Sequence, residues 1–183
     1  MKGTVTKTFY GVEFKVYTDK KIDGDFIKDE AVYFENDVEI TGNLKVKYLK
    51  TEKSITVLKS YTVEKWEEVG GSQEVGGYQE VGGYQKVGGY QEVGGDSTVK
   101  LGINVGLSIK IGGTLKFGKR LFAGICAWRD IVPDEMTITC AKLEGGEVVH
   151  GTVIETGIKL EQDDKMSEAM ELLKNNGYKV IKE

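Results

Sequence analysis

The sequence predicts a mainly β protein built around a β-solenoid, a chain wound into coils of about 18 residues. Two observations predict this fold class. From Val57 to Phe117 every sixth residue is Val, Ile or Phe, eleven times in succession. The middle repeats are almost identical, reading EVGGSQ, EVGGYQ, EVGGYQ, KVGGYQ and EVGG. A fixed short period of this kind is typical of a repeat architecture in which each coil covers the next.

The composition fits a globular protein more than a disordered one. The chain has 183 residues, of which 39% are hydrophobic and 30% are charged, so we expect one domain with small appendages. Its 25 glycines accompany a single proline, unlike a disordered Gly-rich linker. The net charge is −4, and no basic stretch is interleaved with aromatic residues. This disfavours nucleic acid as a partner.

The beginning of the chain alternates polar and apolar residues, MKGTVTKTFYGVEFKVY, and has no continuous apolar core. We therefore expect no signal peptide and no membrane span, and a cytoplasmic location. The two cysteines, Cys126 and Cys140, are most simply small buried residues of a protein in a reducing compartment. They could pair only if their strands are neighbours.

Each hexad combines a short strand with a corner. Side chains alternate in a strand, so the residue two positions before each aliphatic residue shares its face. Gly-Gly follows the aliphatic residue and is expected to supply positive φ values at the corner. Three sides per coil place Val87 directly over Val69, Lys86 over Glu68, and Lys110 over Glu92. Because the grid also extends back to Phe34, fifteen sides give about five coils.

The repeated glutamines at 73, 79, 85 and 91 have the same parity as the buried valines. We expect them to point inward, where stacked amides can form hydrogen bonds with one another. The alternative is that the glutamines face water while Tyr78, Tyr84 and Tyr90 turn inward at the corners.

The two ends give three predicted regions: residues 1–25 as an N-terminal β cap, 26–118 as the solenoid, and 119–183 as a small C-terminal α+β domain. Residues 4–17 read as a hairpin around Gly11 that covers the first coil. Residues 121–128 read as a strand, and 136–143 with 148–155 as a second hairpin. A helix is expected near 165–175, ended by Asn176-Gly177, and a last strand at 178–181.

The segment VEITGNLKV, with the later hexads, resembles the bactofilin family of polymer-forming right-handed β-helices. The VGGSQ and VGGYQ run also resembles phage and prophage proteins of low-GC bacteria. The resemblance covers about residues 26 to 118 and implies a β-helix. Bactofilins polymerise end to end, whereas both ends of this repeat carry ordered-looking sequence. We therefore expect a monomer or a small closed oligomer.

Catalytic motifs are not apparent. His150 is the only histidine, and a dyad with Cys126 or Cys140 has no local support, so we expect a histidine on a hairpin strand. Two cysteines and one histidine without ligand spacing do not suggest zinc, and the Gly-Gly pairs lack the context of a phosphate-binding loop. The repeat also differs from that of hexapeptide acyltransferases. We expect no catalytic residue, no cofactor and no metal.

The predicted function is a non-catalytic β-solenoid that acts as a structural or protein-interaction module in a phage or prophage setting. One alternative is an inhibitor of a bacterial host or defence protein, and another is an enzyme with an unrecognised site. Two aromatic residues 18 apart would stack on one side of the coil and give a large anchor. The candidate protein-binding residues are therefore Trp66, Glu68, Tyr84 and Lys86.

Overall fold

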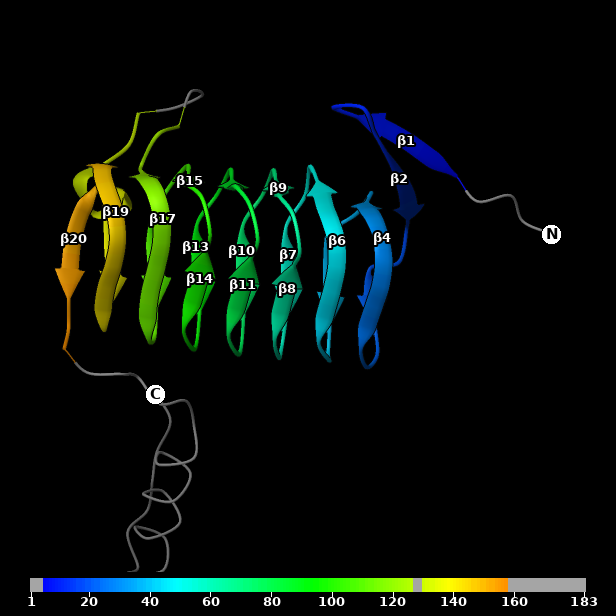
Figure 1. Ribbon diagram of the computed structural model, residues 1–183, viewed down its shortest axis with the longest axis horizontal. Helices are drawn as coiled ribbons and strands as arrows, with labels where there is room; N and C mark the ends of the chain where they lie inside the picture. Colours follow the sequence, from blue (N-terminus) through cyan, green and yellow to red (C-terminus); the bar gives the residue numbers. More distant parts are fainter. Residues whose placement is uncertain (1–4, 127–129, 158–183) are drawn as a thin grey trace, which may run out of the picture.

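The computed structural model describes residues 5–126 and 130–157, which form a rod of stacked β-coils (Figure 1). The solenoid has about eight turns, with equivalent residues about 18 apart. Each complete coil has three faces, and the strands of successive coils pair in parallel. None of the described helices is long and apolar enough to cross a membrane.

The chain begins with a hairpin of β1 (Thr6–Phe9) and β2 (Val12–Tyr17). Four long strands run along the first face and turn onto the second: β4 (Phe26–Phe34), β6 (Leu44–Thr51), β17 (Thr114–Ala123) and β19 (Lys142–His150). The short strands of these two faces are β8 (Tyr61–Val63), β11 (Gln79–Val81) and β14 (Ser97–Val99) on the first, and β9 (Glu67–Val69), β12 (Gln85–Val87) and β15 (Ile103–Val105) on the second. The third face contains β3 (Lys21–Ile22), β5 (Val38–Ile40), β7 (Ile55–Val57), β10 (Gln73–Val75), β13 (Gln91–Val93), β16 (Ile109–Ile111), β18 (Thr137–Cys140) and β20 (Thr152–Glu155). A 3-10 turn, η1 (Pro133–Met136), precedes β18.

The predicted register is confirmed. Val87 in β12 pairs with Val69 in β9, so these residues are vertical neighbours in the rod. The first and third residues of each three-residue strand are buried, whereas the middle one is more exposed. The aliphatic side chains of all three faces meet in one continuous core along the axis. The hydrophobic grid of the sequence is therefore the inner lining of the solenoid.

The glycine pairs at the corners do not have the positive φ values that we expected from the sequence. They are required instead by the close approach of successive coils. A Cβ at Gly82 would lie 1.9 Å from the carbonyl oxygen of Glu64, one coil away, and a Cβ at Gly88 would lie 2.1 Å from that of Gly70. These same corners hydrogen-bond to the preceding coil, for example from Gly82 N to Val63 O at 2.8 Å. A side chain here would therefore separate the coils and break these bonds.

The parallel stack extends beyond the six-residue grid at both ends. In the early coils Lys15 pairs with Val32, a spacing of 17. Late in the chain Ile109 pairs with Ile138, a spacing of 29, because an insertion between β17 and β18 separates the grid from the strand that continues the third face. The second predicted hairpin is wrong: β19 pairs with β17 and β20 pairs with β18, both in parallel. The helix expected near 165–175 and the strand at 178–181 lie outside the described residues.

The interior contains a ladder of polar side chains where the sequence repeats are most alike. The four glutamines point inward and are at most 2% exposed, as expected from their parity. Gln73 and Gln85 each donate from Nε2 to Glu67 Oε1, at 3.1 and 2.7 Å. Higher in the ladder, Gln79 Oε1 accepts from Gln91 Nε2 at 2.6 Å and from Ser97 Oγ at 2.9 Å. These bonds link adjacent faces as well as successive coils.

Glu67 is the acidic member of this ladder and is 2% exposed. Its carboxylate also accepts a hydrogen bond from the buried hydroxyl of Tyr61. Desolvation raises the pKa of Glu67 to about 7, although the hydrogen bonds from Tyr61, Gln73 and Gln85 act in the opposite direction. The reason is that no cation is in contact with this carboxylate among the described residues, so burial opposes its charged form.

Substituting Val81 by Asp should unfold the rod. Val81 is 0% exposed in the middle of the core, and an aspartate there would bury an unpaired charge at a cost of more than about 4 kcal/mol. Circular dichroism during thermal denaturation measures the effect. The control is Glu80→Asp, which places the same side chain one residue away on the outer surface; equal melting of the two variants would contradict the stacked core.

Substituting Glu67 by Gln should stabilise the protein at alkaline pH. Because the folded pKa of Glu67 is raised to about 7, its contribution to stability is full below the unfolded pKa and is lost as pH rises through about 7. At pH 8 the variant should therefore be more stable than the parent by up to about 3 kcal/mol, with a smaller difference near pH 5. Urea denaturation at the two pH values measures this, with the outward Glu80→Gln as the control. A parent and variant that respond equally to pH would contradict a buried, weakly acidic Glu67.

Candidate functional site

Two columns of side chains define the outer surface where the first face turns onto the second. At the corner itself, backbone hydrogen bonds join successive coils, from Glu67 N to Tyr84 O and from Gln85 N to Gly102 O, so that residues 18 apart are stacked. This corner column contains Tyr48, Trp66, Tyr84, Gly102 and Arg120. The neighbouring column, on the outside of the second face, contains Lys50, Glu68, Lys86, Asn104 and Phe122.

The N-terminal hairpin covers the first part of both columns. Phe14 of β2 is 0% exposed and packs in a small core outside the solenoid, separate from the axial core. Its ring centroid lies 5.7 Å from that of Trp66, and the ring of Tyr10 in the hairpin turn lies 5.5 Å from Trp66 on another side. In Figure 1 the hairpin rises from the edge of the rod and its turn reaches along the rod over later coils. The hairpin thus starts the parallel stack, because β2 pairs with β4, and it also packs against the outer surface of the following coils.

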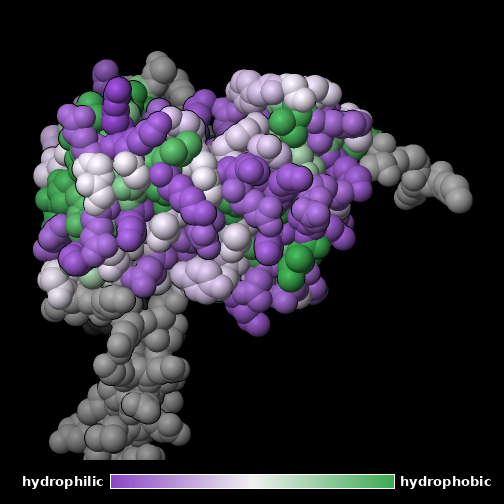
Figure 2. Space-filling view, viewed as in Figure 1, coloured by the Kyte–Doolittle hydropathy of each residue, from purple (hydrophilic) through white to green (hydrophobic). Residues whose placement is uncertain are grey.

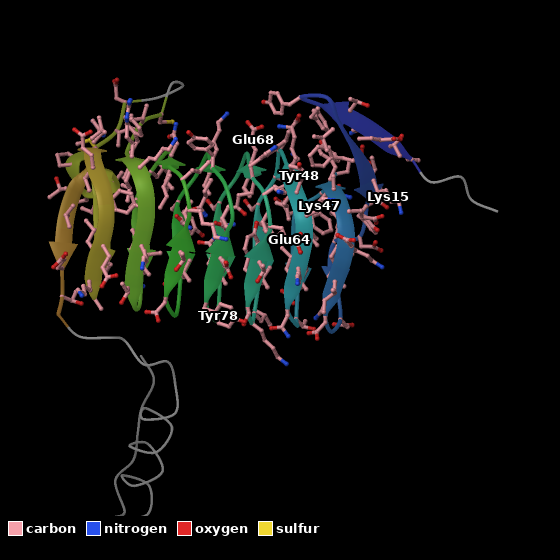
Figure 3. The ribbon with its side chains drawn as sticks, viewed as in Figure 1. Lys15, Lys47, Tyr48, Glu64, Glu68 and Tyr78 are labelled. Atoms are coloured by element: carbon pink, nitrogen blue, oxygen red, sulfur yellow. The ribbon has the colours of Figure 1, made fainter. Side chains whose placement is uncertain are left out.

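Glu68 ties the hairpin to the second face. Its carboxylate accepts hydrogen bonds from Lys50 Nζ at 2.6 Å and Lys86 Nζ at 2.7 Å, one coil before it and one coil after it. The hydroxyl of Tyr10 donates to the same carboxylate at 3.2 Å. Desolvation would raise the pKa of Glu68, but the hydrogen bonds from the two lysines outweigh it and lower the pKa to about 2. Glu68 therefore remains an anion and neutralises part of the charge of this column (Figure 3).

A groove opens where the hairpin ends. The corner column changes there from aromatic residues to Gly102, and the Tyr84 ring packs against this glycine: a Cβ at this position would lie 3.2 Å from Tyr84 Cε1. The groove encloses about 490 Å³ and is lined by Tyr84, Gln85, Lys86, Gly102, Ile103, Asn104, Lys119, Arg120 and Phe122. In Figures 1 and 2 the hairpin projects from one edge of the rod, and the surface of the later coils lies lower beside it.

The four residues predicted to bind a protein therefore have different surroundings. Trp66 and Glu68 contact the hairpin. Trp66 and Tyr84 therefore do not form the single exposed aromatic pair that we expected. Tyr84 is 52% exposed and lines the groove together with Lys86. Sequence reasoning did not identify the other groove residues, although the spacing of 18 that placed Lys86 over Glu68 also leads to Asn104 and Phe122.

The remaining candidates do not join this site. Tyr78 projects from the opposite edge of the rod in Figure 3, at the corner between the third and first faces. Tyr90 lies before β13 and donates a hydrogen bond to Glu74 at 2.5 Å. Both cysteines are free thiols, and His150 Nδ1 lies 2.6 Å from the carbonyl oxygen of Ala123. Within residues 5–126 and 130–157, no group of three or more His, Cys, Asp or Glu side chains could hold a metal ion.

No known protein family, curated protein or solved structure matches this chain. The site is therefore characterised by its own geometry. It consists of an ion-paired column that the hairpin contacts at Glu68, followed by an open groove with aromatic walls and a basic rim.

Substituting Glu68 by Gln should destabilise the protein, in contrast to the same change at Glu67. Lys50 is only 7% exposed, and loss of the carboxylate would leave its ammonium group without a charge partner, at a cost of about 1–3 kcal/mol. Since the pKa of Glu68 is depressed, its contribution is present above the unfolded pKa and is lost as pH falls toward about 2. Urea denaturation at pH 7 measures this. The control is Glu92→Gln, which removes a single exposed ion pair to Lys110; equal losses in both variants would contradict the special role of Glu68.

Proposed function

We propose that this protein is a non-catalytic β-solenoid that serves as a protein-interaction module, and that the groove beside the hairpin is its contact surface. The observation that carries the proposal is the groove itself, which is lined by the 52% exposed Tyr84 and by Phe122, from the coils before and after the coil of Gly102. Tyrosine, phenylalanine and arginine are enriched at the centres of protein interfaces, because they offer large contact areas. A rigid stack of coils holds these groups in place before a partner arrives.

The chemistry of the groove favours binding over catalysis. Its lining residues include no carboxylate, thiol or imidazole in the part of the chain that the structure describes. A hydrogen bond to Glu68 raises the pKa of Lys86, so its ammonium group remains protonated and is a poor nucleophile. The groove therefore offers fixed cations and aromatic surface. The phage or prophage setting suggested by the hexads is part of the same proposal, because it directs the search for the partner to bacterial proteins.

Photo-crosslinking tests this proposal. A photoreactive phenylalanine derivative at Asn104, in the groove, should capture a discrete protein from a bacterial lysate, whereas the same group at Thr98, on the first face, should not. Capture by the Asn104 derivative should decrease at least about ten-fold when Tyr84 and Phe122 are both replaced by alanine, since these residues supply the aromatic anchor.

The matched control replaces Leu58 and Tyr78, two exposed residues at the corner between the third and first faces, by alanine. Both double variants must melt like the parent. Capture that is unaffected by the groove substitutions, or equally reduced by the control pair, would contradict the proposed contact surface.

A further inference from the structure

The rim of the groove is basic, although the chain carries a net charge of −4. Lys119 and Arg120 are consecutive, exposed residues of β17. Among the described residues, neither forms an ion pair within 4 Å. Such adjacent cations without partners repel each other, and an anionic ligand would relieve this repulsion.

The carboxylates nearest in register do not neutralise this rim. Glu68 is shared by two lysines and the Tyr10 hydroxyl. Glu147 of β19 is the register neighbour of Arg120, and it is exposed without an ion pair to it within 4 Å. The groove therefore retains an excess of positive charge on its open side.

The walls of the groove are aromatic. The rings of Tyr84 and Phe122 come from the coils before and after the coil that contains Gly102 and Asn104. In that middle coil the side chain of Ile103 points into the axial core. Gly102 adds no side chain between the walls. A ligand that fits both features has an apolar side chain for the groove and carboxylates for the rim. The planar guanidinium of Arg120 can bind a carboxylate through two parallel hydrogen bonds.

We propose that the groove binds a short acidic segment of a protein partner, with one apolar or aromatic side chain between Tyr84 and Phe122 and its flanking carboxylates on Lys119 and Arg120. This inference rests on the proposed function and specifies the chemistry of the partner. Charge complementarity selects this occupant, because the rim is a local reversal of the overall negative charge.

Fluorescence polarisation with the full chain tests the inference. The probe is a labelled peptide in which a central phenylalanine lies between pairs of aspartates, and its comparison peptide has asparagine in place of aspartate. At about 50 mM salt the aspartate peptide should bind at least about ten-fold more tightly, and this preference should shrink at about 300 mM salt because exposed charges are screened.

Charge reversal locates the effect. Lys119→Glu with Arg120→Glu should abolish the preference for the aspartate peptide. Lys59→Glu with Lys116→Glu makes the same change in net charge at exposed positions away from the groove and should preserve it. Both variants must melt like the parent.

Several outcomes would overturn the inference. These are equal affinity for the two peptides, no binding of the aspartate peptide at about 100 μM, and equal losses in the two charge-reversal variants. Stronger competition by an oligothymidine would identify nucleic acid, instead of an acidic protein segment, as the ligand of the groove. Concentration-dependent dimerisation through the groove would identify a second copy of this chain. Capture from the lysate that depends on Tyr84 and Phe122 but not on Lys119, Arg120 or salt would support the groove as a protein-binding surface and would contradict an acidic partner. If capture depends on neither set, both proposals fail.

Discussion

The structure depends on the parallel backbone ladder that joins each residue to the residue about 18 positions away. The ladder places side chains of the same parity in vertical columns, so each residue type in the repeat forms a continuous stripe on the rod. Val69 and Val87 illustrate the inner stripe, and Glu68 and Lys86 illustrate the outer one. Because a single coil cannot bury its own apolar lining, each column is stable only through its neighbours in the stack.

Adjacent glutamates show how strongly the ladder determines side-chain chemistry. Glu67 and Glu68 differ by one position, yet the first points into the core and the second toward solvent and two lysines. Desolvation dominates inside and raises the pKa, whereas ion pairs dominate outside and lower it. Parity in the strand thus converts one residue type into two groups with opposite dependence of stability on pH.

The groove arises from the same regularity. Each column keeps its place on the rod while its residues differ in size, so large and small side chains follow one another and the surface becomes uneven. The corner column is aromatic where the hairpin packs against it, and it loses its side chain at Gly102. The hairpin packs against Trp66, whereas Tyr84 in the next coil is 52% exposed, so two aromatic residues of one column have different surroundings. The solenoid fixes the positions of the two columns, and the residue types in these columns determine where the groove lies.

The sequence by itself determined the solenoid, the spacing of 18, the inward glutamines and the stacking of Lys86 on Glu68, because all of these follow from a local period and strand alternation. It did not reveal the outer coils, where a spacing of 17 and the insertion before β18 interrupt the period while the backbone ladder continues. The parallel pairing of β18 with β20 was also hidden, because the segment from Glu144 to Glu147 has the local pattern of a hairpin turn, whereas in the structure it lies inside β19. Only the tertiary structure decided that the hairpin packs against Trp66 and Glu68 and that Lys119, Arg120 and Phe122 line the same groove as Tyr84. These contacts depend on where the hairpin folds back onto the rod and on which corner lacks a side chain, and a one-dimensional period carries no information about either.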